Sequence, residues 1–158
     1  MATTVTPATL TVRIVATISL AGQDKGFDHS FTVASVTEVV NRIVNIPTSE
    51  MAVLVFTATS PGSDTTIGLN EADVRFICLT NLDDTNFIQI TIISENNNEC
   101  AHKLEAGHTI MIPISAEGVV DVHDASATAL TVSFDDITSI TALADSAACD
   151  LQVFAAGV

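Results

Sequence analysis

The sequence predicts an all-β chain that folds as an antiparallel β-sandwich or barrel. Apolar and polar residues alternate in several segments of strand length, turn-forming residues separate these segments, and no segment has a convincing helical pattern. The chain has 158 residues, of which 47% are hydrophobic, and this suits one domain with a buried core. We find no internal repeat and no interdomain linker. We therefore expect a short N-terminal arm over residues 1–9 and a single β-sandwich domain over residues 10–158.

The first half of the chain contains the clearest alternation. In residues 10–20, LTVRIVATISL, every second side chain is apolar, which is typical of a strand with one buried face. Residues 36–47 fit both helical and extended spacing. Because their apolar residues are mostly β-branched, we expect a strand that ends at Pro47, with a helix over Val36–Ile46 as the open alternative. The other elements expected here are a turn at 21–26, strands at 27–33 and 51–59, and a loop at 60–73.

A cluster of Asn, Asp and Thr separates two predicted strands, at 74–81 and 87–93. Asn81, Asp83, Asp84 and Asn86 have short side chains that bond to nearby backbone and tolerate turn conformations, so we interpret the cluster as a β-corner. A calcium loop requires oxygen ligands at defined offsets, and the D-x-[DN]-x-[DN]-G spacing is absent here. A calcium site assembled from several acidic loops is the alternative.

The last third of the chain again alternates strand and loop patterns. Residues 108–115, HTIMIPIS, place Ile110, Ile112 and Ile114 on one side of a predicted strand. The other expected elements are a polar loop at 95–107, a loop with a short strand at 117–129, a strand interrupted at Asp135–Asp136, and strands at 139–144 and 149–157.

Composition excludes several classes of partner. Five basic residues face nineteen acidic ones, and a formal charge of −14 repels phosphate backbones and anionic lipid. The chain has no Tyr and no Trp, the usual stacking anchors for sugars and single-stranded nucleic acids, and we expect Phe76 and Phe87 to lie in the core. No apolar run reaches bilayer-spanning length, and no signal peptide is expected. We therefore expect neither a nucleic-acid nor a membrane partner.

Candidate metal ligands and nucleophiles are dispersed. Cys78, Cys100 and Cys149 are odd in number and lack C-x-x-C spacing, so free thiols and a reducing cytoplasm are expected. The histidines are His29, His102, His108 and His123. The densest ligand-like group is Asp121, His123 and Asp124, which we interpret as a solvated loop. No G-x-S-x-G elbow marks an activated serine, and we expect no catalytic residue, cofactor or metal.

Residues 103–113, KLEAGHTIMIP, carry a partial motif. Gly107, followed by five residues and Pro113, resembles the second conserved motif of the cupins, whose enzymes bind a metal through His and Glu. Ser115 and Gly118 stand where that motif continues with Gly and His, and the first cupin motif is missing. We therefore expect Gly107 to be a turn residue and Pro113 to lie on an edge strand or bulge. A cupin-like metalloenzyme is the least favoured of the functions considered.

Three segments together resemble small jelly-roll structural proteins of tailed-bacteriophage virions. They are LTNLDDTNFIQITI, KLEAGHTIMIPI and SITALADSAACDLQVFAAG, in which the matching residues are Asn81–Asn86, Leu104–Gly107 and Ile140–Ala144. The resemblance implies a jelly-roll-like sandwich and a capsid decoration, or cement, protein located in the virion and assembled in the host cytoplasm. The alternative that it implies is a tail or fibre module that binds a host receptor. It carries over no catalytic residue.

Several predicted strands, such as residues 10–20 and 109–115, carry almost no Lys or other charge. Exposed strand edges are usually protected by such residues, so we expect edges or faces to be covered by neighbouring subunits. The expected partners are a major capsid protein or another virion protein, and further copies of the chain in a homotrimer. An acidic protein also complements a basic capsid surface, which speeds and orients encounter.

Overall fold

A computed structural model describes residues 5–56, 69–115, 118–120 and 134–158. This part of the chain is all-β and contains no helix. Its strands are β1 (Ala8–Ala16), β2 (Ser19–Leu20), β3 (Gln23–Asp24), β4 (Phe27–Val36), β5 (Glu38–Ile46), β6 (Met51–Val55), β7 (Val74–Asn81), β8 (Ile88–Ser94), β9 (Glu99–Leu104), β10 (Thr109–Pro113), β11 (Ile137–Ala144) and β12 (Cys149–Gly157). Most of the loop expected at 117–129, and residues 130–133 of the interrupted strand, lie outside the described residues.

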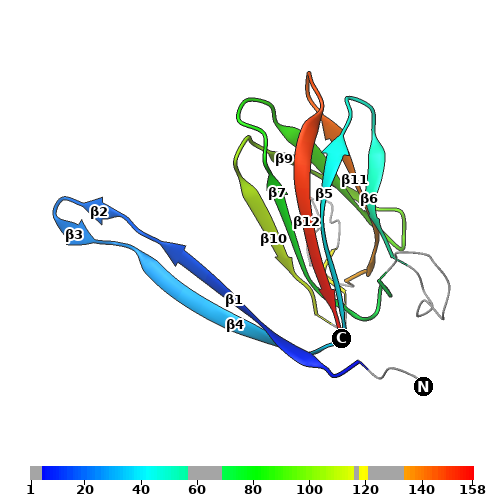
Figure 1. The fold of residues 1–158 in the computed structure, drawn as a ribbon, viewed down its shortest axis with the longest axis horizontal. Helices are drawn as coiled ribbons and strands as arrows, with labels where there is room; N and C mark the ends of the chain where they lie inside the picture. Colours follow the sequence, from blue (N-terminus) through cyan, green and yellow to red (C-terminus); the bar gives the residue numbers. More distant parts are fainter. Residues whose placement is uncertain (1–4, 57–68, 116–117, 121–133) are drawn as a thin grey trace, which may run out of the picture.

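Two antiparallel four-stranded sheets form the body of the molecule (Figure 1). Their strand orders are β10-β7-β12-β5 and β6-β11-β8-β9. Within them β5 pairs with β12, β6 with β11, β7 with β10, and β8 with β9. The first strand of this segment thus pairs with the last, the second with the last but one, and so on inward to β8 and β9. This pairing is jelly-roll connectivity. The predicted fold class, an antiparallel β-sandwich of jelly-roll type, is confirmed.

Aliphatic side chains fill the space between the two sheets. Ile77 and Leu79 of β7 and Leu151 of β12 are completely buried, and so are Ile90 of β8 and Ile140 of β11 in the facing sheet. Each such side chain stabilises the fold by roughly 1.5–3 kcal/mol relative to an exposed one. The apolar residues at alternate positions therefore form the inner face of each sheet.

The phenylalanines are placed differently from the prediction. Phe76 is buried, but it belongs to a second cluster on the outer side of the β10-β7-β12-β5 sheet. Phe87 is only half-buried, and the Lys103 ammonium lies 4.3 Å from its ring centre. The main core is thus built almost entirely from aliphatic residues.

Several predicted strands are confirmed with little change. Strands β7 and β12 coincide with the predicted segments, and Ile110, Ile112 and Ile114 pack against the core as expected. Residues 38–46 are extended, which confirms the strand prediction over the helical alternative. The ambiguity arose because β5 carries apolar residues on both faces: Val40 and Val44 pack inward, whereas Val39 and Ile43 are exposed.

Strand β9 was predicted as part of a polar loop. Only Leu104 among its six residues is buried, so the segment shows no alternation of apolar and polar side chains. Backbone pairing with β8, from Ile88↔Leu104 to Ile93↔Glu99, holds it in the extended conformation. The prediction failed because an edge strand that is exposed on both faces has a polar sequence.

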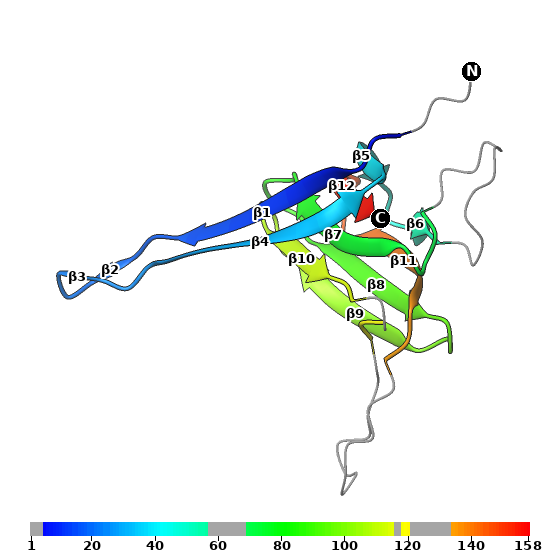
Figure 2. The same ribbon diagram turned by 90° about the horizontal axis from the view of Figure 1, so that it is seen from below.

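Residues 8–36 form a long hairpin, here called the hairpin, that joins neither four-stranded sheet. Strand β1 pairs with β4 from Ala8↔Val36 to Ala16↔Phe27, and β2 pairs with β3 at the tip. Figures 1 and 2 show the tip reaching well beyond the sandwich. The strand predicted at 10–20 therefore lies outside the sandwich, whose strands run from Glu38 to Gly157 rather than from residue 10.

Candidate functional site

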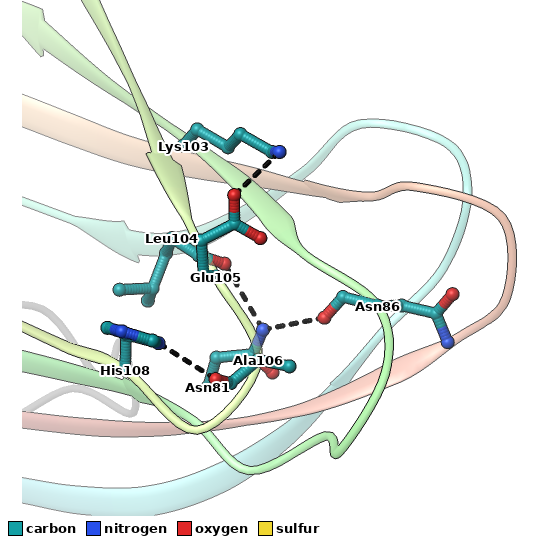
Figure 3. Close-up of polar contacts among 7 residues, drawn as sticks. All are labelled: Asn81, Asn86, Lys103, Leu104, Glu105, Ala106 and His108. Carbon is teal, nitrogen blue, oxygen red and sulfur yellow. Dashed lines mark hydrogen bonds and ion pairs between the residues drawn. The ribbon is translucent and has the colours of Figure 1, made fainter.

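The polar cluster at 81–86 carries the chain from β7 in one sheet to β8 in the other. The buried Asn81 side chain donates hydrogen bonds from Nδ2 to the carbonyl oxygens of Asn86 (2.9 Å) and Leu104 (3.2 Å), as Figure 3 shows. Its Oδ1 accepts a bond from the Asp83 backbone N–H at 3.0 Å. Each polar atom of this amide is therefore bonded to backbone, and the side chain fixes the path of the corner.

The two Asp residues of the cluster also bond locally. Asp83 Oδ1 accepts from the backbone N–H groups of Asn86 (2.6 Å) and Thr85 (2.8 Å), and these two bonds hold the pKa of Asp83 below its ordinary value. Asp84 is exposed and accepts from the Thr85 hydroxyl at 2.9 Å. The β-corner prediction is confirmed, since these side chains are engaged in building the turn.

A second turn packs against this corner. Gly107 has a φ of +69°, a backbone conformation that favours glycine, and it lies between β9 and β10. The His108 carbonyl accepts from the Asn81 backbone N–H at 3.0 Å, and His108 Nδ1 lies 2.8 Å from the Ala106 carbonyl oxygen (Figure 3). Pro113 ends β10 at the edge of its sheet. The predicted roles of Gly107 as a turn residue and Pro113 as an edge residue are confirmed.

The structure does not gather the candidate metal ligands that it describes into a metal-binding cluster. Over the described ranges, no three His, Cys, Asp or Glu side chains converge in a way that suits a metal ion. The trio Asp121, His123 and Asp124 lies outside the described residues. Cys78, Cys100 and Cys149 are free, and burial raises the pKa of the Cys78 and Cys149 thiols, which lowers their reactivity.

One buried carboxylate was missed in the sequence. Asp135 is 5% exposed and accepts hydrogen bonds from Ser94 Oγ (3.0 Å), Asn96 Nδ2 (2.7 Å) and Asn98 Nδ2 (3.2 Å). The polar run 95–98 after β8 was the available signal, but nothing in it indicated a distant Asp as the partner. With three donors in place, Asp135 anchors the β8–β9 turn rather than offering a free carboxylate.

The hairpin packs on the outer side of the β10-β7-β12-β5 sheet. Phe76 of β7 makes edge-to-face contacts with Phe31 of the hairpin and Phe154 of β12, with ring centres 6.0 and 6.1 Å apart. Val36 and Ala156 are buried in the same cluster. The proximal half of the hairpin is thus held by an apolar contact of its own, separate from the main core.

The distal hairpin, residues 13–29, extends past this contact. Val15, Ile18, Leu20 and Phe27 are 54%, 55%, 63% and 57% exposed. An Arg13–Asp28 ion pair, with Nε 2.9 Å from Oδ1, links the two strands at its base. A two-stranded hairpin in water is only marginally stable, and four exposed apolar side chains on it form the kind of surface that marks interaction sites in other proteins.

The outer side of the sheet is almost uncharged. We call it the neutral face; it comprises the outward residues at alternate positions 39–45 of β5, 150–156 of β12, 76–80 of β7 and 109–113 of β10. Asp150, at one end, is its only charged residue, and its Oδ1 accepts from Asn45 Nδ2 at 2.9 Å. On the β5 side, Val39 and Ile43 are 56% and 62% exposed.

Charge is unevenly divided between the two parts of the chain. The hairpin carries Arg13, Lys25, Asp24 and Asp28, which sum to zero. The rest of the chain therefore holds three of the five basic and seventeen of the nineteen acidic residues, and with them the entire formal charge of −14.

No protein-family model matches this chain, and no curated protein is detectably similar to it in sequence. The described residues include no helix of the length and hydropathy needed to cross a membrane.

Proposed function

We propose that the protein is a structural component of a tailed-bacteriophage virion, a capsid decoration protein that binds and stabilises the head shell and catalyses no reaction. The observation that carries this proposal is a jelly-roll body packed with aliphatic side chains, from which an apolar hairpin projects. Such an element adds no chemistry, but it offers contact area to a neighbour.

The polar residues support a structural role. Asn81, Asp83 and Asp135 are residue types that can act as metal ligands or acids, but each is hydrogen-bonded to backbone or to amide side chains in a way that fixes a turn. Two of the three segments that resemble virion proteins, around Asn81 and Gly107, are bonded to each other through the backbone at Asn81 and His108. These two segments form paired turns at one end of the sandwich, and the third segment supplies β11 and β12.

The charge of the body indicates the chemistry of the partner. Seventeen acidic residues against three basic ones complement a basic shell surface, which accelerates and orients binding. Since the attraction acts between exposed charges, raising the salt concentration is expected to weaken binding.

Particles that lack the protein provide the direct test. We expect the purified chain to occupy regular positions on such shells by electron microscopy, to raise their resistance to heat, and to dissociate at high salt. Shells with unchanged occupancy and heat resistance after addition of the chain contradict the proposal.

A receptor-binding tail or fibre module is the second candidate, and the projecting tip at β2–β3 favours it, because a tip is accessible to a distant surface. Binding of the isolated chain to host cells, together with no binding to shells, would select this function.

A further inference from the structure

The neutral face is only partly covered by the hairpin of its own chain. Val12 and Phe31 of the hairpin lie in the cluster that contains Phe76 and Phe154 of the face. An open cavity of about 350 Å³ lies between hairpin and sheet, and its lining includes Val12 and Arg13 of the hairpin and Cys78 and Met111 of the sheet. Next to it, Val39 and Ile43 of β5 stay exposed. The face thus offers uncovered apolar surface beside a contact that it already makes.

The same apolar strip of the hairpin that makes this contact continues into the distal hairpin. Leu10, Val12, Ile14 and Ala16 share one side of β1. Their neighbours across the ladder on β4 are Val33, Phe31, His29 and Phe27, so His29 is the one polar residue of the strip. Phe31 packs on the sheet, whereas Phe27, at the far end of the strip, is 57% exposed. The distal hairpin therefore presents the kind of surface that the neutral face binds within one chain.

We infer that the distal hairpin of one copy packs on the neutral face of a second copy, over Val39 and Ile43. Charge decides in favour of a second copy. Two bodies that each carry −14 repel one another over most of their surface, whereas the hairpin is neutral and the face has a single charge at its rim. Two copies that associate through the hairpin of one and the neutral face of the other therefore do not bring their acidic groups together.

The contact joins two different surfaces, a hairpin on one copy and a face on the other. It closes either as an isologous reciprocal pair, in which each copy supplies one hairpin and one face, or as a heterologous ring. The inference concerns association of the chain with itself, and it does not depend on the shell as partner.

Sedimentation velocity of the purified full chain, over a range of concentrations, tests the inference. We expect the wild type to form oligomers, and the double variant Ile18→Ser/Leu20→Ser and the single variant Ile43→Asp each to weaken association roughly tenfold or more. Leu82→Ser and Val55→Asp are the matched controls, since Leu82 and Val55 are exposed apolar residues outside both surfaces. We expect these two variants to associate like the wild type.

Mixing the hairpin variant with Ile43→Asp gives a sharper test than either variant alone. The hairpin variant keeps an intact neutral face and Ile43→Asp keeps an intact hairpin. The two variants, labelled differently, are therefore expected to associate with each other more tightly than either does with itself. Circular dichroism should show wild-type strand content for each variant. A wild type that stays monomeric at all accessible concentrations overturns the inference, and so do variants that associate as the wild type does.

Binding to shells, measured in parallel, separates this inference from the proposed function. If the wild type is monomeric and the hairpin variant loses shell binding, the hairpin docks on the shell protein and the inference is wrong. If self-association behaves as expected but the wild type does not bind shells, the inference stands and the proposed function fails.

Discussion

Strands β7 and β1 have similar patterns of alternating apolar residues, but they have different surroundings. In β7 one set of alternate residues faces the second sheet and the other set faces the hairpin, so Leu79 and Ile77 are completely buried and Phe76 is 3% exposed. In β1 no residue is fully buried, and Val15 near its end is 54% exposed.

This comparison separates two properties of a strand: whether one of its faces is apolar, and what covers that face. A period of two indicates that one face of a strand is apolar. What covers that face is decided by the tertiary structure: the opposite sheet covers the inner face of β7, whereas the distal hairpin stays exposed in the single chain. Variants that probe the two regions in the same way show how far this difference extends.

The largest effect is expected from truncating a leucine in the body. Leu79→Ala removes a side chain with no exposed surface and should lower the free energy of unfolding by about 2–5 kcal/mol. Leu20→Ala, at the 63%-exposed tip, should change it by less than about 0.5 kcal/mol. Urea denaturation at a concentration where the chain is monomeric measures both values. Equal losses for the two variants would mean that the tip is buried in the single chain.

A smaller effect is expected at the corner. Asn81→Ala leaves the carbonyl groups of Asn86 and Leu104 without their donor and should cost about 1–3 kcal/mol, because these groups lie in or near the core. The control Asp84→Ala removes an exposed side chain bonded only to Thr85 and should cost less than about 0.5 kcal/mol. If Asp84→Ala proved the more harmful change, or removed a binding activity from a folded chain, the corner would be more than a turn.

The attachment of the hairpin to the body is the third target. Phe31→Ala removes the edge-to-face contact with Phe76, which contributes about 0.5–1.5 kcal/mol beyond burial of area. Backbone amides of β4 should then exchange with solvent roughly tenfold faster, while β7 and β12 keep their protection. Phe27→Ala, in the same strand but beyond the contact, is the control and should leave the exchange of residues 30–36 unchanged. Slower or equal exchange in Phe31→Ala would show that the hairpin is held by other contacts.

The smallest effect is a dependence on pH. Backbone donors from Asn86 and Thr85 lower the pKa of Asp83 in the folded chain, so the folded state favours the charged form. This contribution is present above the pKa of Asp83 in the unfolded chain and is lost as the pH falls through the lowered, folded value. The Tm of wild type should therefore exceed that of Asp83→Asn at neutral pH and approach it in strong acid. A difference in Tm that stays constant down to low pH would assign the effect to packing.

The sequence was a good guide where local chemistry and position in the fold agree. Asn81 and Asp83 are turn-forming residue types and build a turn. Gly107, which precedes β10, has the positive φ that its residue type permits. Alternation also located β7, β10 and β12. These features depend on neighbours within a few residues along the chain.

The misses share a different cause. Strand β9 is held by its pairing with β8, Asp135 is held by side chains about forty residues away in the sequence, and Phe76 is covered by the hairpin. Each depends on a contact between distant segments, and no local pattern specifies such a contact. For the distal hairpin and the neutral face, the sequence predicted only that strands with so little charge have edges or faces covered by neighbours.

By itself the sequence determined that the chain is built of strands and where its principal corner lies, and its charge led us to expect no phosphate-rich partner. The tertiary structure alone decided that residues 8–36 leave the sandwich and that one face of one sheet carries a single charged residue, Asp150. The physical reason is that alternation encodes which side chains avoid water, while the choice of the surface that shelters them is made only when distant strands meet.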